Sequence, residues 1–197
     1  HTAADNTDIR YANTLEVADK EMVYGVSVNN NPTLSDVWNS TPAGGFNYDR
    51  QPITQIEGLG GFVAGSTAYA EWNDMVYAEF GAYRSARKGP LAIFAWNNYK
   101  MADPGNGDSN DMYGNAPYAR VAIHKTFGNN TIMLGGYGLN EKTQTFISKG
   151  PFTQYQDRGV DAQYQYVNDD HIIEAVATQI WETQRPDGGD KSTISVT

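Results

Sequence analysis

Charged and polar side chains recur at alternate positions in several segments of the 197-residue chain. The candidates are Arg10, Glu16, Glu71, Glu79, Arg120, His124, Asp161, Gln163, Gln165 and Glu174. Side chains at every second position of a strand point to the same face. A face of mixed charges among Tyr and Gln would line a hydrated path and select solutes by charge. Because acids outnumber bases in this set, we expect a mild preference for cations.

Metal chemistry has little support in the sequence. The three histidines, His1, His124 and His171, are not spaced as zinc ligands, and a zinc site needs at least three suitable ligands. Residues 103–115 are rich in oxygen ligands but do not follow the spaced acidic pattern of a calcium loop. We predict that this segment is a solvated surface loop and that the chain holds no metal.

Catalytic patterns are also missing. Glu71 and Glu79 share a face, and Asp161 and Glu174 would meet if their strands adjoin, but nothing indicates a pocket around either pair. No serine lies in a nucleophile-elbow pattern. The chain has no Cys, which excludes thiol nucleophiles and covalent haem attachment within it. We therefore predict that it is not an enzyme and carries no cofactor.

Four predicted hairpins position the polar candidates. Period-two alternation covers residues 8–28, 61–85, 117–139 and 158–182, with turns at 18–21, 73–74, 128–130 and 168–170. This predicts about eight antiparallel strands of about nine to eleven residues each. The turns are short, whereas the connections at about 29–59, 86–116 and 140–157 are long. We expect one all-β domain over residues 1–197.

Alternation alone does not show which face meets water. Strands of about nine to eleven residues match a lipid bilayer, and short turns at one rim with long loops at the other are typical of outer-membrane barrels. Trp72, Phe127 and Tyr166 lie on the apolar face beside the turns, where an aromatic girdle belongs. We therefore predict an antiparallel transmembrane β-barrel. The alternative is a soluble all-β ligand-binding domain, a lipocalin-like barrel or a sandwich, with its apolar face inside.

Composition narrows the classes of function further. The net charge of -9 and pI near 4.7 argue against a nucleic-acid binder, which needs a basic face. No apolar run approaches the 18 residues of a membrane-spanning helix. The chain opens without a signal peptide, as a mature form or an internal fragment would.

Several segments resemble a family of bacterial outer-membrane proteins in which an N-terminal C-x-x-C-H haem segment precedes a β-barrel. The resemblance covers Asn29–Tyr48, "GLGGFVAGSTAYAEWNDMVYAEFGAYRSA", "APYARVAIHKTFGNNTIMLGGYG" and "DRGVDAQYQYVNDDHIIEAVA", hence most of the chain. Without Cys, no haem role carries over to any residue here. The ending "DKSTISVT" also departs from the terminal aromatic strand usual in such barrels, so we expect a portion of a larger barrel, with a closed eight-stranded barrel as the alternative.

These observations predict a porin-like barrel in a bacterial outer membrane that lets small polar solutes or ions pass. Its expected partner is outer-membrane lipid. A second hypothesis, which follows from the resemblance, is that the barrel is a scaffold for a c-type cytochrome. The sequence does not identify the solute, the total number of strands or the oligomeric state.

Overall fold

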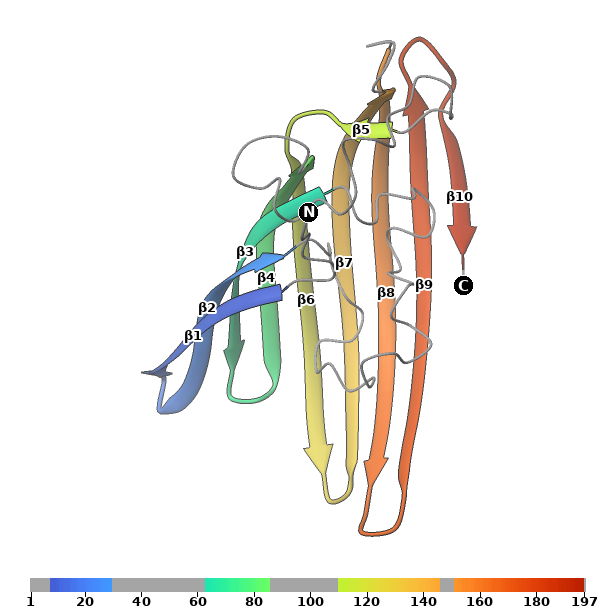
Figure 1. Cartoon of the computed structure of the whole chain (residues 1–197). Helices are drawn as coiled ribbons and strands as arrows, with labels where there is room; N and C mark the ends of the chain where they lie inside the picture. The colour runs from blue at the N-terminus through green and yellow to red at the C-terminus, as the bar shows by residue number, and fades with distance from the viewer. Residues whose placement is uncertain (1–7, 30–62, 86–109, 146–150, 197) are drawn as a thin grey trace, which may run out of the picture.

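The computed structural model describes residues 8–29, 63–85, 110–145 and 151–196 (Figure 1). Ten strands lie in these ranges. They are β1 (Asp8–Val17), β2 (Lys20–Asn29), β3 (Val63–Trp72), β4 (Val76–Ser85), β5 (Asn110–Met112), β6 (Ala116–Phe127), β7 (Asn130–Thr145), β8 (Thr153–Val167), β9 (Ile172–Pro186) and β10 (Ser192–Val196). Within the same ranges, no helix is long and apolar enough to cross a lipid bilayer.

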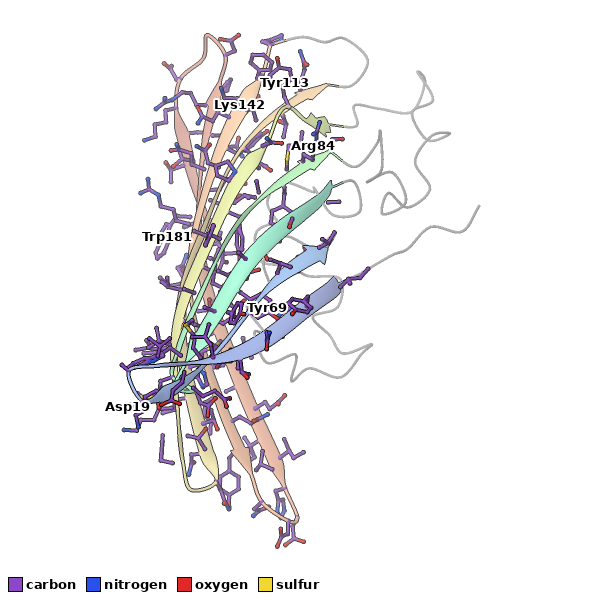
Figure 2. All side chains as sticks on the ribbon, turned by 90° about the vertical axis from the view of Figure 1, so that its left-hand side faces the viewer. Asp19, Tyr69, Arg84, Tyr113, Lys142 and Trp181 are labelled. Carbon is purple, nitrogen blue, oxygen red and sulfur yellow. The ribbon has the colours of Figure 1, made fainter. Side chains whose placement is uncertain are left out.

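The strands form one antiparallel sheet in the order β1-β2-β3-β4-β6-β7-β8-β9-β10, and β5 pairs with β7. Except for β5, each strand lies beside its neighbours in the chain. This arrangement follows from the short turns of the four hairpins. Figure 2, a side view, shows that the sheet is curved, with β1 and β2 bending away from the long strands β6–β9.

The hairpin turns share one rim of the sheet, which we call the turn rim. Ala18 and Asp19 both have positive φ, 53° and 58°, as a two-residue turn that matches the twist of its strands requires. Asn73 and Asp74 also have positive φ, which Asn and Asp tolerate better than most residues. In the last turn, the Asp170 and His171 backbone N–H groups donate to Asn168 Oδ1. The opposite rim, where the longer connections leave the sheet, is the loop rim.

The outer face carries the apolar side chains. Phe80, Val121 and Ile123 are 67%, 63% and 58% exposed, and Val76 is 41% exposed. Cross-strand pairing continues this face from Ile123 to Leu134 of β7, which is also exposed. An exposed apolar surface of this extent marks a contact with lipid or with another protein.

The outer apolar surface ends before the strands do. On β6 it runs from Ala119 to Phe127, with Lys125 near the turn as a charged exception. We call these outer-face positions, with their cross-strand partners in the other strands, the apolar band. At roughly 3.3 Å per residue, the nine residues from Ala119 to Phe127 span about 30 Å along the strand. At the loop rim, β7 and β8 continue with outward Asn140 and Gln156, which are polar.

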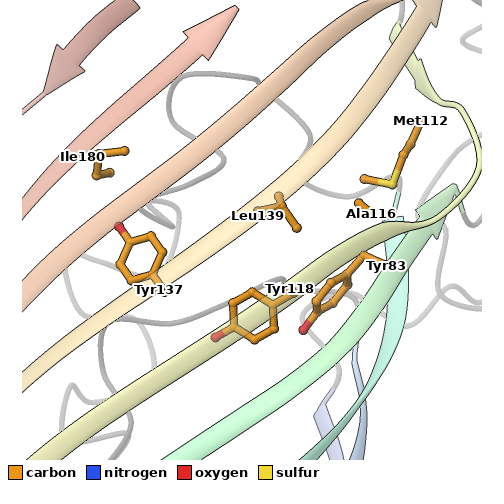
Figure 3. Packing of buried hydrophobic residues seen from close by; sticks show 7 residues of the cluster. All are labelled: Tyr83, Met112, Ala116, Tyr118, Tyr137, Leu139 and Ile180. Carbon is orange, nitrogen blue, oxygen red and sulfur yellow. The ribbon is translucent and has the colours of Figure 1, made fainter.

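The inner face holds the buried side chains. Its larger apolar cluster lies toward the loop rim and combines aromatic and aliphatic residues from the five strands β4, β5, β6, β7 and β9 (Figure 3). The members are Tyr83, Met112, Ala116, Tyr118, Tyr137, Leu139 and Ile180. Tyr83 and Tyr118 pack edge to face, with ring centroids 5.7 Å apart. A second cluster of Tyr77, Ala122 and Met133 lies nearer the turn rim.

The prediction of an all-β antiparallel fold is confirmed, and all eight predicted hairpin strands are present. The strand number was too low, because β5 and β10 lie in segments that showed no clear alternation. The predicted loop at 140–157 is wrong, since β7 continues to Thr145 and β8 begins at Thr153. β5 lies within the predicted loop at 86–116. Most of the predicted loop at 29–59, and residues 86–109 of the second, lie outside the described residues.

Strand lengths and closure also differ from the prediction. β6 to β9 have 12 to 16 residues rather than about nine to eleven. The predicted length corresponds to the apolar band alone, because beyond it both faces are polar and the alternation disappears. Among the described strands, β1 and β10 do not pair with each other, so the sheet is open.

Candidate functional site: the polar inner face

Cross-strand register places the predicted lining residues on the inner face. One row joins Glu79 of β4 to Arg120 of β6. A neighbouring row leads from Glu71 through Tyr77 and Ala122 to Gly135 and Asp161. Gln165 and Glu174 are direct partners in a third row. The alternation predicted from sequence therefore assigned these side chains to one common face.

The β1 candidates lie at the edge of this face. The Arg10 guanidinium lies over the Tyr69 ring, 5.6 Å from its centroid, which is a cation–π geometry. Glu16 follows at the same alternation and is exposed. In Figure 2, Tyr69 projects toward the hollow side of the sheet and Trp181 toward the opposite side.

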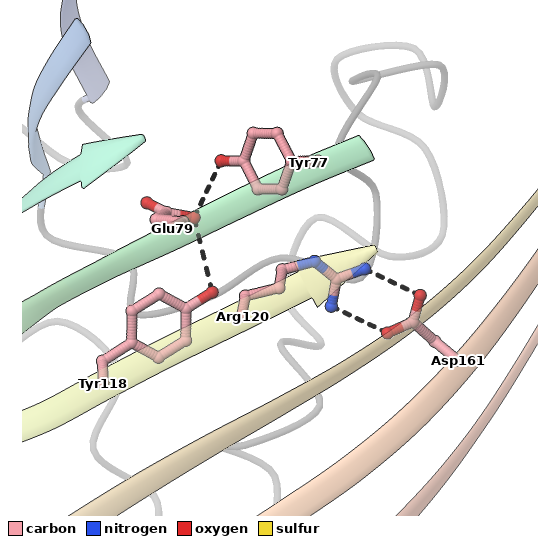
Figure 4. A network of polar contacts seen from close by, with 5 residues as sticks. All are labelled: Tyr77, Glu79, Tyr118, Arg120 and Asp161. Atoms are coloured by element: carbon pink, nitrogen blue, oxygen red, sulfur yellow. Dashed lines mark hydrogen bonds and ion pairs between the residues drawn. The ribbon is translucent and has the colours of Figure 1, made fainter. Parts of the chain in front are cut away.

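An ion pair between Arg120 and Asp161 lies at the centre of the inner face (Figure 4). Arg120 Nη1 and Nη2 each donate to one Asp161 oxygen at 2.7 Å, so the pair is bidentate. The residues are 2% and 4% exposed. The alternation predicts both residues as lining groups but does not predict their contact, because they lie two strands apart.

Gly135 makes this contact across β7 possible. It lies between Ala122 and Asp161 in register, directly beneath the ion pair. A Cβ at this position would lie 2.7 Å from Arg120 Nη2 and 2.9 Å from Asp161 Oδ1. The glycine at this position therefore has a structural reason, because any larger residue would meet the ion pair.

Glu79 is surrounded by hydroxyl donors. Thr67 Oγ1 donates to Glu79 Oε1 at 2.5 Å, and the Tyr77 hydroxyl donates to Oε2 at 2.9 Å. The Tyr118 hydroxyl lies 3.5 Å from the same Oε2 (Figure 4). Both carboxylate oxygens of Glu79 therefore have hydroxyl partners in a partly buried position. The sequence placed tyrosines at the same alternation as these charges, but it did not show that they surround Glu79.

Nearer the turn rim, the inner-face polar groups are more accessible. His124 Nε2 donates to Glu71 Oε1 at 2.5 Å, and these side chains are 11% and 29% exposed. Gln165 Nε2 donates to Glu174 Oε1 at 2.7 Å, and this pair is exposed. Gln163, one step closer to the centre, is buried. The inner face is thus accessible toward the turn rim and closely packed at its centre.

Three carboxylates gather on the inner face near the loop rim. Asp157 of β8 pairs in register with Glu182 of β9, Glu141 of β7 lies diagonally across, and all three are buried. The outward neighbours of Asp157 are the polar Gln156 and Arg158, so this level lies outside the apolar band. Burial raises the pKa of Asp157 to about 8, and the carboxylates of Glu182 and Glu141 act in the same direction. Asp157 was not among the predicted site residues, because it lies in the segment 140–157 that was predicted to be a loop.

The predicted girdle residues lie on the outer face beside the turns. Phe127 and Tyr166 share one row through Asn130. Trp72 lies in the row of Val76 and Ile123. On β6, Ile123 is four residues closer to the loop rim than Phe127, so Trp72 lies closer to that rim than the other two aromatics. Its indole Nε1 donates to the Val17 carbonyl at 3.1 Å. Each of the three aromatics therefore lies beside the turn of its own hairpin, and they do not share one cross-strand row. Their role as a girdle stays a prediction.

The acid pairs considered in the sequence, Glu71 with Glu79 and Asp161 with Glu174, do not form on the described inner face. Within the described ranges, no group of three His, Cys, Asp or Glu side chains could hold a metal ion. Glu71 contacts His124, and Glu79 contacts hydroxyl groups, so these two carboxylates do not act together. Asp161 likewise binds Arg120 rather than Glu174.

Comparison with models of protein families found no match to this chain, and neither a curated protein nor a solved structure matches it.

Proposed function

We propose that the chain forms the wall of a porin-like barrel in a bacterial outer membrane, through which small polar solutes or ions pass passively. The observation that carries the proposal is the orientation of the sheet. Its large apolar side chains are exposed on the outer face, whereas Arg120, Asp161 and Gln163 are buried on the inner face. A soluble barrel or sandwich has the reverse arrangement, and a membrane barrel has this one.

The dimensions of the apolar band support insertion in a membrane. Strands of outer-membrane barrels tilt by about 35–45°, so a band of about 30 Å along the strand is roughly 23 Å tall. This matches the apolar height of about 25 Å of such barrels. The backbone groups inside the sheet are paired between strands, which lipid requires.

The accessible inner-face charges favour cations. The Arg120–Asp161 pair has no net charge, since each side chain neutralises the other. Glu79 is surrounded by hydroxyl groups, and among the more accessible carboxylate and guanidinium groups of the lining the acids Glu16, Glu71 and Glu174 outnumber the base Arg10. These side chains lie where the inner face remains accessible, and fixed negative charge beside a pore raises the local cation concentration.

Planar-bilayer recording tests this proposal on the protein isolated from the membrane fraction. In a potassium chloride gradient we expect a reversal potential of the sign that marks cation preference. Replacing Glu71 and Glu174 by Gln should move the reversal potential toward zero. A matched pair in exposed connections, Asp169→Asn with Asp190→Asn, should move it less. Anion preference would contradict the expected cation selectivity, and the absence of conductance from inserted protein would exclude the proposed passage of ions.

The two other hypotheses receive no support from the described strands. A soluble ligand-binding domain needs the apolar faces around its interior, and here they point outward. No observation on the described residues favours a cytochrome scaffold.

A further inference from the structure

Charge divides between the two faces of the sheet. The chain as a whole has a net charge of -9. Among the strand residues whose side chains the structure describes, every acid follows the alternation of the inner face. The charged side chains on the outer face of these strands are all basic, and they are Lys20, Arg84, Lys125, Lys142, Arg158 and Arg185. A face of purely positive charge on an acidic chain indicates a negatively charged partner.

Three of these cations gather at the loop-rim edge of the apolar band, on neighbouring strands. Lys142 of β7, Gln154 of β8 and Arg185 of β9 form one cross-strand row. Arg158 of β8 lies four residues closer to the turn rim, in the row that reaches Ala119, where the band ends on β6. All three cations are exposed. We call Lys142, Arg158 and Arg185 the loop-rim cations.

The described acids nearby do not pair with the loop-rim cations. Glu141 and Asp157 directly precede two of them in the chain, but successive side chains of a strand point to opposite faces. These carboxylates are therefore buried inside, whereas the cations lie outside. Asp187 and Asp190 lie in the exposed connection after β9, and neither forms an ion pair in the described part of the chain. The loop-rim cations thus remain accessible to an external anion.

The positions of the loop-rim cations match the headgroup layer of a bilayer. At roughly 3.3 Å per residue and a strand tilt of about 35–45°, the four residues between the two rows correspond to about 10 Å of height. The headgroups add roughly 5–8 Å to each side of the hydrocarbon, and the long stems of Lys and Arg can span the difference. Trp181 is the direct cross-strand partner of Arg158 and projects away from the hollow side of the sheet (Figure 2). Trp is enriched at this level of a membrane.

We infer that the loop-rim cations bind the phosphate group of an anionic lipid headgroup, with Arg158 at the hydrocarbon edge and Lys142 and Arg185 farther out. This inference rests on the proposed membrane function and adds to it a class of lipid in the leaflet at the loop rim. A guanidinium presents paired N–H donors that match phosphate oxygens. A lipid is favoured over free phosphate because the cations adjoin the apolar band, which the acyl chains would cover. At the turn rim, by contrast, the described outer-face cations Lys20 and Lys125 are separated by β3 and β4.

Fluorescence quenching by brominated lipids tests the inference at the site itself. The protein is reconstituted in phosphatidylcholine vesicles that contain brominated phosphatidic acid, whose headgroup is a phosphate monoester. Two variants each keep one Trp among the 197 residues, either Trp181 beside the loop-rim cations or Trp72 near the turn rim, with Phe at the other Trp positions. At Trp181 we expect phosphatidic acid to bind more tightly than phosphatidylcholine, by about fivefold for each contributing cation. At Trp72 the preference should be smaller, because the cations of that rim are dispersed.

Substitutions then assign the preference to the loop-rim cations. Replacing all three by Gln should abolish the preference at Trp181, and Arg158→Gln alone should lower it about fivefold. The matched control, Lys20→Gln with Lys125→Gln, removes cations from the same face at the other rim and should leave the preference at Trp181 unchanged. A preference that persists in the triple variant would overturn the inference. Displacement of the brominated phosphatidic acid by inorganic phosphate, at an ionic strength held constant with sodium chloride, would also overturn it, because the ligand would then be a free anion.

Brominated phosphatidylcholine reads the proposed function separately. This lipid should quench both Trp181 and Trp72 when the outer face meets the bilayer. If it quenches neither residue, the membrane location is wrong and the inference fails with it. If it quenches Trp181 as strongly as brominated phosphatidic acid does, the membrane location stands and the lipid preference alone is overturned.

Discussion

At the scale of single residues, the Arg120–Asp161 pair is the most constrained feature of the inner face. Both side chains are almost completely buried, and each supplies the other's main countercharge. Replacing Asp161 by Asn leaves the guanidinium buried without a full countercharge. We expect a loss of about 3–5 kcal/mol in the free energy of unfolding. Chemical denaturation of the protein folded in lipid vesicles measures this loss.

The matched control removes both charges together. Arg120→Met combined with Asp161→Leu replaces the pair by apolar side chains, and such replacements are often neutral or stabilising. A double variant that loses as much stability as Asp161→Asn would show that the pair contributes more than mutual neutralisation.

Asp157 makes the stability of the folded protein depend on pH. Its pKa is raised from 3.8 to about 8, so between these values the folded protein binds a proton that the unfolded chain releases. Stability then falls as pH rises through this window, with a slope on the order of 1 kcal/mol per pH unit for one proton. Melting temperatures of the lipid-folded protein at pH 5 and pH 8 should differ accordingly.

Asp157→Asn removes the titrating group and should flatten this pH profile. Asp169→Asn, in an exposed turn, serves as the control and should leave the slope unchanged. A wild-type protein that becomes more stable toward pH 8 would contradict the assignment of a raised pKa.

At the scale of the strands, inner-face glycines and large side chains form complementary pairs. The Tyr137 ring of β7 lies over Gly159 of β8, its cross-strand partner, where a Cβ would overlap the ring. Gly159→Ala should therefore destabilise the protein by about 1–3 kcal/mol, as overpacking of a well-packed interior does. Equilibrium unfolding in vesicles measures the effect.

A double-mutant cycle isolates this contact. In the background of Tyr137→Ser, which removes the ring, Gly159→Ala should cost much less than in the wild type. Gly136→Ala is a matched control, since the glycine faces outward and its Cβ would meet its nearest atom at 3.5 Å. An equal cost of Gly159→Ala in both backgrounds would exclude the ring as its cause.

The strands also show how much the sequence predicts. Alternation located eight strands and four turns because one face is apolar and the other polar within the apolar band. Near the loop rim this contrast disappears, so Thr153–Asp157 reads as a loop although it forms the start of β8. Contacts across two strands, such as Arg120 to Asp161, depend on register and on Gly135. Register over long connections cannot be read from local periodicity.

At the scale of the whole molecule, the sheet has its apolar side chains outside and its charged groups inside. The apolar band is about 30 Å long on β6 to β8, and the buried polar network lies behind it. Narrow barrels fill their interior with side chains, and the packed centre around Arg120 agrees with this. On the proposed function, the inner face toward the turn rim, where Glu71 and Glu174 remain accessible, would govern the access of solutes.

The most direct test of this arrangement is to place a charge at the middle of the apolar band. Ile123→Arg, at a position that is 58% exposed, should destabilise the protein in lipid vesicles by about 2–4 kcal/mol. Gln156→Arg, on the outer face beyond the band, should cost no more than about 1 kcal/mol. If both variants are as stable as the wild type, and the protein stays in solution without detergent, the outer face meets water and the membrane assignment is wrong.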